Sequence, residues 1–127
     1  MMKFEFTLTG QIPSGKNAVK INPRTGGHYP DKRFKLWRED ATHQLMQQNA
    51  QTGGNPYFNK PCVVHVGYWA GDKRRRDVPG MMDALCHLLE HCCIVEDDSL
   101  LEDWHWLKMH VSTQSPQVKM IIEEKGQ

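Results

Sequence analysis

The chain has 127 residues, of which 39% are hydrophobic and 24% are charged, a composition typical of one globular domain and unlike that of a disordered chain. No stretch approaches the roughly 18 consecutive apolar residues of a membrane-spanning helix, and the first residues alternate apolar and polar, so we expect neither a membrane segment nor a signal peptide. The net charge is only +1, yet residues 1–76 carry 13 Lys or Arg and 5 Asp or Glu, whereas residues 77–127 carry 3 and 10. This asymmetry is typical of proteins that bind nucleic acid or metal ions, although mutual neutralisation of the two halves explains it equally well.

The first half of the chain predicts two strands and one helix. Residues 3–9 alternate apolar and polar, which indicates a half-buried strand. Residues 10–30 are rich in Gly, Pro, Asn and Ser and predict a long loop. Asp31 is a good helix N-cap, and apolar residues at helical spacing extend the predicted helix to about residue 49. Residues 61–69 are strongly β-prone and predict the second strand.

The second half begins with a basic run at residues 73–76. A helix is predicted over about 79–92, with Pro in its first turn and a row of apolar side chains on its buried face. A polar turn follows at residues 96–99. Residues 100–111 and 117–124 then predict the third and fourth strands.

The predicted order is β-loop-α-β-α-β-β, which indicates an α+β (mixed α/β) fold. We expect helices packed on one small mixed sheet, in a single domain that spans residues 1–127. On the third strand, Trp104 and Trp106 alternate with His105, so both indoles should lie on one face. Packing in the core or in a dimer interface is the expected role of the indoles, and stacking on DNA bases is the alternative.

The cysteine pattern does not suggest disulfides. There is no C-x-x-C pair, and two of the four cysteines are sequence neighbours: Cys62, Cys86, Cys92 and Cys93. We therefore expect reduced thiols and a cytoplasmic protein. His87 and His91 are four residues apart on the predicted second helix with three cysteines nearby, which makes a weak candidate for structural zinc.

Carboxylates dominate residues 77–103, which hold eight Asp or Glu and no Lys or Arg. Carboxylate oxygens are the ligands that Mg²⁺ prefers, and a bound Mg²⁺ activates water and stabilises the leaving oxygen in phosphodiester hydrolysis. Asp77, Asp97 and Asp98 are the first candidates, although a helix cap and an ordinary turn also account for them. A helix of about 14 residues is about 20 Å long, so Asp77 meets Asp98 only if the chain folds back.

Candidate DNA-binding residues precede the carboxylates. Cations beside a carboxylate site bind flanking phosphates and offset the repulsion between carboxylates and DNA. An ordinary solvated loop is the competing explanation. The candidates are Lys73, Arg74, Arg75 and Arg76, together with Lys16 and Asn17 in the long loop.

Two segments carry a resemblance to a known family. Residues 74–77 (Arg-Arg-Arg-Asp), an apolar helix, and residues 94–98 (Ile-Val-Glu-Asp-Asp) resemble the RusA family of Holliday-junction resolvases. The 21-residue step from Asp77 to Asp98 fits the family pattern, as does the Pro-Ser-x-x-Asn loop at residues 13–17. The resemblance implies a homodimeric, Mg²⁺-dependent endodeoxyribonuclease without an organic cofactor. Such an enzyme resolves four-way DNA junctions by paired symmetric nicks in recombination and repair.

The resemblance assigns roles residue by residue. Asp77 matches the first catalytic Asp of the family, Asp98 the last, and Asp97 the acidic residue before it. The family's second Asp falls on Pro79, which cannot bind metal, and its helix Lys falls on Asp83.

We interpret Asp83 as a compensating metal ligand and catalytic residue, because helical side chains lean toward the N-terminus and Asp83 can point back toward Asp77. The alternatives are a catalytically weakened junction-binding relative and an unrelated small binding protein whose acidic stretch pairs with its basic half.

Overall fold

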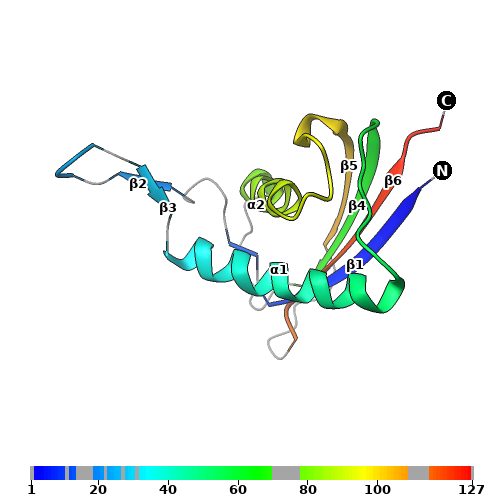
Figure 1. Cartoon of the computed structure of the whole chain (residues 1–127), viewed down its shortest axis with the longest axis horizontal. Helices are drawn as coiled ribbons and strands as arrows, with labels where there is room; N and C mark the ends of the chain where they lie inside the picture. Colours follow the sequence, from blue (N-terminus) through cyan, green and yellow to red (C-terminus); the bar gives the residue numbers. More distant parts are fainter. Residues whose placement is uncertain are drawn as a thin grey trace.

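The computed structural model describes residues 2–10, 12–13, 19–21, 23–26, 28–30, 32–69, 78–108 and 115–126. In chain order the elements are β1 (Lys3–Thr9), β2 (Val19–Ile21), β3 (His28–Pro30), α1 (Lys32–Thr52), β4 (Cys62–Trp69), α2 (Val78–His91), the 3₁₀ helix η2 (Asp98–Leu100), β5 (Leu101–Lys108) and β6 (Gln117–Glu124). Both α-helices lie on the same face of one sheet (Figure 1). The predicted α+β class is therefore confirmed, and the homodimer stays a prediction.

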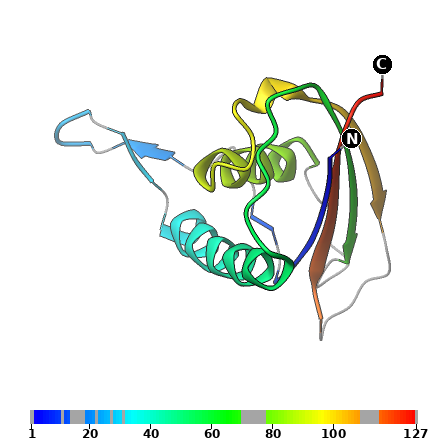
Figure 2. The ribbon, with the colours of Figure 1, turned by 45° about the vertical axis from the view of Figure 1, so that its right-hand side comes forward.

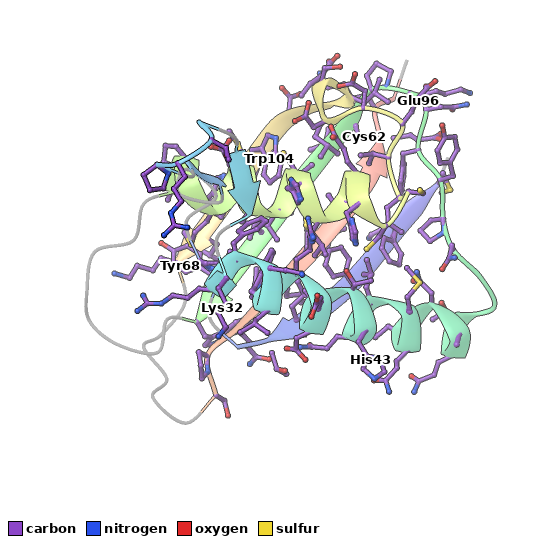
Figure 3. The ribbon with its side chains drawn as sticks, turned by 60° about the vertical axis from the view of Figure 1, so that its left-hand side comes forward. Lys32, His43, Cys62, Tyr68, Glu96 and Trp104 are labelled. Carbon is purple, nitrogen blue, oxygen red and sulfur yellow. The ribbon has the colours of Figure 1, made fainter. Side chains whose placement is uncertain are left out.

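The main sheet has four strands in the order β1-β6-β4-β5. β6 is antiparallel to both β1 and β4, whereas β4 and β5 are parallel. A parallel pair needs a crossover connection, and α2 is the helix of that crossover. Because parallel strands begin at the same edge, the segment before β5 lies at the edge where β4 begins. Figure 3 shows Cys62, the first residue of β4, and Glu96 at the same end of the molecule.

The core lies between the helices and the sheet (Figure 2). Alternate residues of β1, β4 and β6 point toward the helices, and the apolar faces of α1 and α2 cover them. The side chains with less than 2% exposure include Leu8, Val64, Val66, Met120 and Ile122 from the sheet and Leu45, Leu85, Leu88 and Leu89 from the helices. Of the helices in the described part of the chain, none combines the length and the apolar character that a membrane crossing requires.

The edge strand β1 is closed by two glutamines of α1. The Thr7 amide donates to Gln48 Oε1 at 2.9 Å, and Gln48 Nε2 donates to the Thr7 carbonyl at 2.6 Å. Gln44 makes the same two contacts with Thr9, at 2.8 and 3.3 Å. Each side-chain amide thus replaces a peptide group of a neighbouring strand. This pairing attaches α1 to the sheet and satisfies an edge that would otherwise be open to another chain.

Within the described residues the sequence predictions for the elements hold with two differences. The predicted N-cap Asp31 and the predicted strand residues 109–111 lie outside those residues. The first helix continues to Thr52 instead of ending near residue 49. Residues 10–30 were expected to be a loop, but the described residues include the short antiparallel strands β2 and β3. Three-residue strands give no usable alternation pattern, so the Gly and Pro content dominated that prediction. Trp104 and Trp106 stack at 5.7 Å and pack against the core, as predicted.

Candidate metal centre

The chain reverses direction sharply at the end of α2. Cys93 adopts a left-handed conformation with φ of 57°, which is a position that normally favours glycine. Its amide donates to the Glu90 carbonyl at 3.0 Å, and the Ile94 amide donates to the Leu89 carbonyl at 2.9 Å. This pair of hydrogen bonds is the Schellman helix ending, and the buried side chains of Leu89 and Ile94 are its hydrophobic contact. The reversal brings the next residues back along α2.

The returning segment is held by a β-bridge between Val95 and Phe58. Phe58 donates its amide to the Ile94 carbonyl at 2.8 Å and accepts from the Glu96 amide at 2.9 Å. Asp97 then has extended backbone and caps η2, because its Oδ1 accepts from the Ser99 amide at 2.9 Å. The polar turn that the sequence predicts at residues 96–99 is therefore a capped 3₁₀ helix with a defined backbone.

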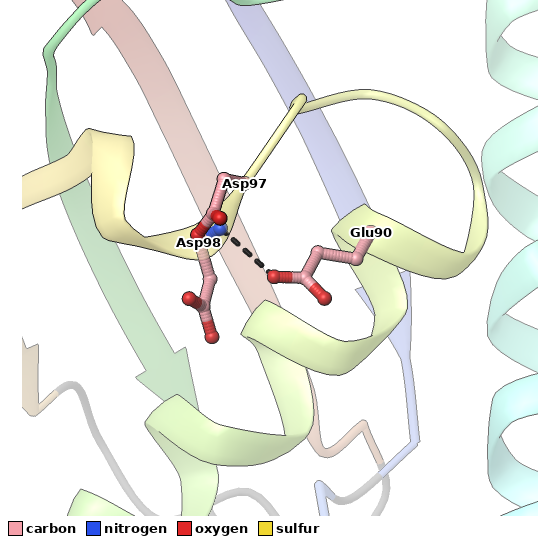
Figure 4. A group of neighbouring side chains, drawn as sticks. All are labelled: Glu90, Asp97 and Asp98. Atoms are coloured by element: carbon pink, nitrogen blue, oxygen red, sulfur yellow. Dashed lines mark hydrogen bonds between the residues drawn. The ribbon is translucent and has the colours of Figure 1, made fainter.

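Three carboxylates meet where the returning segment passes α2 (Figure 4). One oxygen each from Glu90, Asp97 and Asp98 lies within 4.8 Å of the other two, and all three residues are exposed. Glu90 Oε1 also accepts the Asp98 backbone amide at 2.8 Å. That hydrogen bond fixes the last turn of α2 against the first residue of η2. We name Glu90, Asp97 and Asp98 the carboxylate cluster.

The electrostatics of the cluster differ between its two aspartates. The pKa of Asp98 is raised above the usual value for an aspartate, first by partial burial and then by Glu90, Asp97 and Asp83. The pKa of Asp97 is lowered, chiefly by its hydrogen bonds from Ser99. Asp98 therefore holds its proton more tightly than Asp97, because partial burial and the negative charges already present both oppose its ionisation. A cation at this position would relieve the same repulsion.

Asp83 lies on the same exposed face of α2 as Glu90, seven residues earlier. Its oxygens are outside the carboxylate cluster, but its charge contributes to the raised pKa of Asp98. Cys86 lies between these two turns of the helix. Burial, followed by Asp98, Asp83 and Glu90, raises the pKa of the Cys86 thiol to about 12. A thiol whose pKa is raised in this way is a weaker nucleophile at neutral pH, because less of it is thiolate.

The remaining sequence candidates lie outside the described residues. These are Asp77, the basic residues Lys73, Arg74, Arg75 and Arg76, and the loop residues Lys16 and Asn17. Val78, the first residue of α2, and Glu90 are separated by about 18 Å along the helix axis, at 1.5 Å per residue. Convergence of Asp77 with Asp98 stays a prediction. Of the predicted metal ligands, the structure brings together Asp97 and Asp98 and places Asp83 within electrostatic reach of them.

Sequence reasoning did not single out Glu90. The residue belongs to the acidic window of residues 77–103, but the family pattern directed attention to the aspartates alone. The available signal was its position seven residues after Asp83, which places both side chains on one helix face. The reversal at Cys93 then determines that Asp98 returns to this face.

The zinc candidate does not form a group of three ligands among the described residues. Cys92 Sγ contacts Thr42 Oγ1 at 3.6 Å, and the His87 ring accepts a hydrogen bond from Arg38. Comparison of the sequence with models of known protein families gave no match, and comparison with curated proteins gave none either.

Proposed function

We propose that this protein is a divalent-cation-dependent endonuclease that cuts branched DNA, with the carboxylate cluster as its cation site. The observation that carries the proposal is the cluster itself. Two elements of the fold hold three exposed carboxylates within 4.8 Å, and partial burial together with the neighbouring carboxylates raises the pKa of Asp98. The resemblance to RusA resolvases supports the choice of a four-way DNA junction as substrate, cut by a homodimer in recombination and repair.

The donor set suits Mg²⁺, which prefers hard oxygen ligands and retains several waters. Glu90 and Asp97 each use one oxygen to accept a backbone amide, which orients the carboxylate and leaves its second oxygen for a ligand. A bound Mg²⁺ would lower the pKa of water and stabilise the charge that develops during phosphodiester hydrolysis. The protein's own part is to hold Glu90, Asp97 and Asp98 in place and to keep them exposed to a phosphate. Asp83 supports the cluster through its charge.

The basic side chains at the start of α1 support the proposal that the substrate is a polyanion. The first turn of α1 contains no acidic residue. The first two turns together carry four basic side chains: Lys32, Arg33, Lys35 and Arg38. Positive charge at a helix N-terminus opposes the helix dipole, so these residues do not stabilise the helix electrostatically. They do favour binding of a phosphate backbone. The basic run of residues 73–76 directly precedes α2 in the sequence and is proposed to serve the same purpose.

A second function is favoured by one observation. Pro79 is exposed in the first turn of α2, at the position where RusA resolvases carry a second catalytic Asp. Proline has no side-chain ligand for a metal. A junction-binding protein that does not cut is therefore the second candidate.

The deciding experiment incubates a synthetic four-way junction with the protein, with Mg²⁺ or with a chelator. Glu90→Gln and Asp98→Asn remove one charge each, and the glutamine keeps the carbonyl oxygen that accepts the Asp98 amide. Glu96→Gln is the matched control, because Glu96 is exposed, adjacent in sequence and outside the carboxylate cluster.

We expect Mg²⁺-dependent paired nicks from the wild type and from Glu96→Gln, and a rate at least about tenfold lower for Glu90→Gln and Asp98→Asn. Junction binding without any cleavage would select the second candidate. Equal cleavage by all four proteins would remove the carboxylate cluster from the proposal. An absence of both cleavage and preference for branched over linear DNA would remove the function.

A further inference from the structure

Arg38 is a half-buried cation without a negatively charged partner in the described part of the chain. Among the described residues its buried Nε finds no hydrogen-bond acceptor, and its Nη1 donates to His87 Nε2 at 2.9 Å. Burying an arginine is costly unless its N–H groups and its charge find partners. Arginines in such surroundings commonly pair with a carboxylate or a phosphate, whose two oxygens match the planar fork. The neighbouring Asp40 instead accepts a hydrogen bond from Gln44.

The His87 ring that accepts from the Arg38 guanidinium is neutral. A guanidinium only donates hydrogen bonds, so His87 Nε2 must be the acceptor and the ring proton lies on Nδ1. Phe34 meets the His87 ring edge to face at 5.1 Å, and the His91 ring stacks at 6.5 Å. Burial, Arg38 and His91 all lower the pKa of His87, which agrees with a neutral ring. The ring therefore positions Arg38 and does not neutralise it.

The position of Arg38 is defined by the packing of α1 on α2, which lie side by side (Figure 3). Arg38 contacts His87, and Thr42 contacts Cys92. The Arg38 side chain therefore lies where the second turn of α1 meets α2. Lys35 is exposed one turn earlier on α1 and adds a second positive charge nearby.

The contact between Arg38 and His87 lies about one turn of α2 before Glu90 of the carboxylate cluster. His87 precedes Glu90 by three residues on α2, and side chains with that spacing are neighbours, about 5–6 Å apart at Cβ. The charge of Glu90 acts on the His87 ring, which is the ring that Arg38 contacts. Cations next to a carboxylate site are suited to a phosphate adjacent to the one at the site.

We propose that Arg38, oriented by His87 where α1 meets α2, binds a phosphate group. Resting on the proposed function, this phosphate belongs to the DNA backbone next to the bond that is cut. The planar Arg38 guanidinium would donate two hydrogen bonds to phosphate oxygens, and Lys35 would add a positive charge at longer range.

The test compares three variants with the wild type. Arg38→Gln removes the charge but keeps an N–H donor for His87, and Arg38→Lys keeps the charge but loses the planar fork. Lys60→Gln is the control, because it removes an exposed cation in the connection between α1 and β4. Junction affinity is measured in chelator over a range of salt concentrations. In a second arm, inorganic phosphate is titrated while NMR follows the imidazole signals of His87.

We expect Arg38→Gln to weaken junction binding about tenfold or more and to lower the salt slope by about 0.9. Arg38→Lys should fall between Arg38→Gln and the wild type, and Lys60→Gln should change affinity less than about twofold. Phosphate should shift the His87 signals saturably in the wild type and not in Arg38→Gln. Equal junction affinity for Arg38→Gln and Lys60→Gln would overturn the inference and leave the proposed function intact.

If the wild type binds no junction, the proposed function fails and the phosphate titration decides alone. Saturable shifts would then support a site for another phosphorylated ligand, and unchanged signals would overturn it. If Arg38→Gln does not fold, the same comparison is made with Arg38→Lys.

Discussion

Replacement of Asp98 by asparagine should stabilise the protein at neutral pH when no divalent cation is present. The variant removes one of three negative charges whose oxygens lie within 4.8 Å. In water, two unit charges at that distance repel by about 0.9 kcal/mol, and physiological salt reduces this to about half. Two neighbours, Glu90 and Asp97, therefore give a gain of about 1 kcal/mol, or roughly 3–5 °C in Tm for a chain of this size. The Asp98 amide that Glu90 accepts is unchanged by the substitution.

The pH dependence follows from the raised pKa of Asp98 in the folded state. An acid whose pKa is raised on folding binds its proton more tightly in the folded state. Its contribution to stability is therefore present at low pH and is lost as the pH rises from about 3.9 through the folded pKa. The advantage of Asp98→Asn should accordingly be full at pH 7 and should vanish as the pH falls below about 4.

Thermal unfolding with and without Mg²⁺ completes the assay. A ligand that binds only the folded state stabilises it by about 1.4 kcal/mol at ten times its Kd. We expect the wild type to gain stability with Mg²⁺ and Asp98→Asn to gain much less, with Glu96→Gln behaving as the wild type. A variant less stable than the wild type at pH 7, or one that gains as much from Mg²⁺, would refute the reasoning.

Three further predictions concern the fold around the site. Gln48→Ala leaves the Thr7 backbone groups without their partners and should cost about 1–3 kcal/mol in urea unfolding, whereas the exposed neighbour Gln47→Ala should cost little; equal losses would contradict the edge pairing. Cys93→Gly should raise the free energy of unfolding by about 0.5–1 kcal/mol, because the relief of left-handed strain exceeds the added chain entropy, and Cys93→Ala should give no such gain. Iodoacetamide at pH 8 should label the exposed Cys93 well before Cys86, whose pKa is raised to about 12, as mass spectrometry of the peptides would show; equal labelling would contradict the described environment of Cys86.

The fold was largely predictable because its main elements carry strong local patterns. The alternation in β1 and the apolar row of α2 each determine the type of element and its buried face. Two features depended on contacts between distant residues. Nothing local indicates that Gln44 and Gln48 of α1 close the edge of β1. The hairpin of β2 and β3 is too short for its pattern to outweigh the loop-like composition around it.

The candidate site was predictable only in part. The acidic window and the pair Asp97 and Asp98 were visible in the sequence, and the structure keeps both at one place. Glu90 depended on the path of the chain after α2, which a non-glycine residue in a left-handed conformation, Cys93, determines. Sequence patterns assign that conformation to glycine, so the tight reversal, and with it the third carboxylate, could not be anticipated.

The most direct test of the account is a Mg²⁺ titration of the ¹³C-labelled protein, with the side-chain carboxyl signals of Glu90, Asp97 and Asp98 followed by NMR. We predict that all three signals shift with one common Kd while the signal of the exposed neighbour Glu96 stays unchanged. Unshifted cluster signals, or shifts of equal size at Glu96, would contradict the claim that these carboxylates hold a divalent cation.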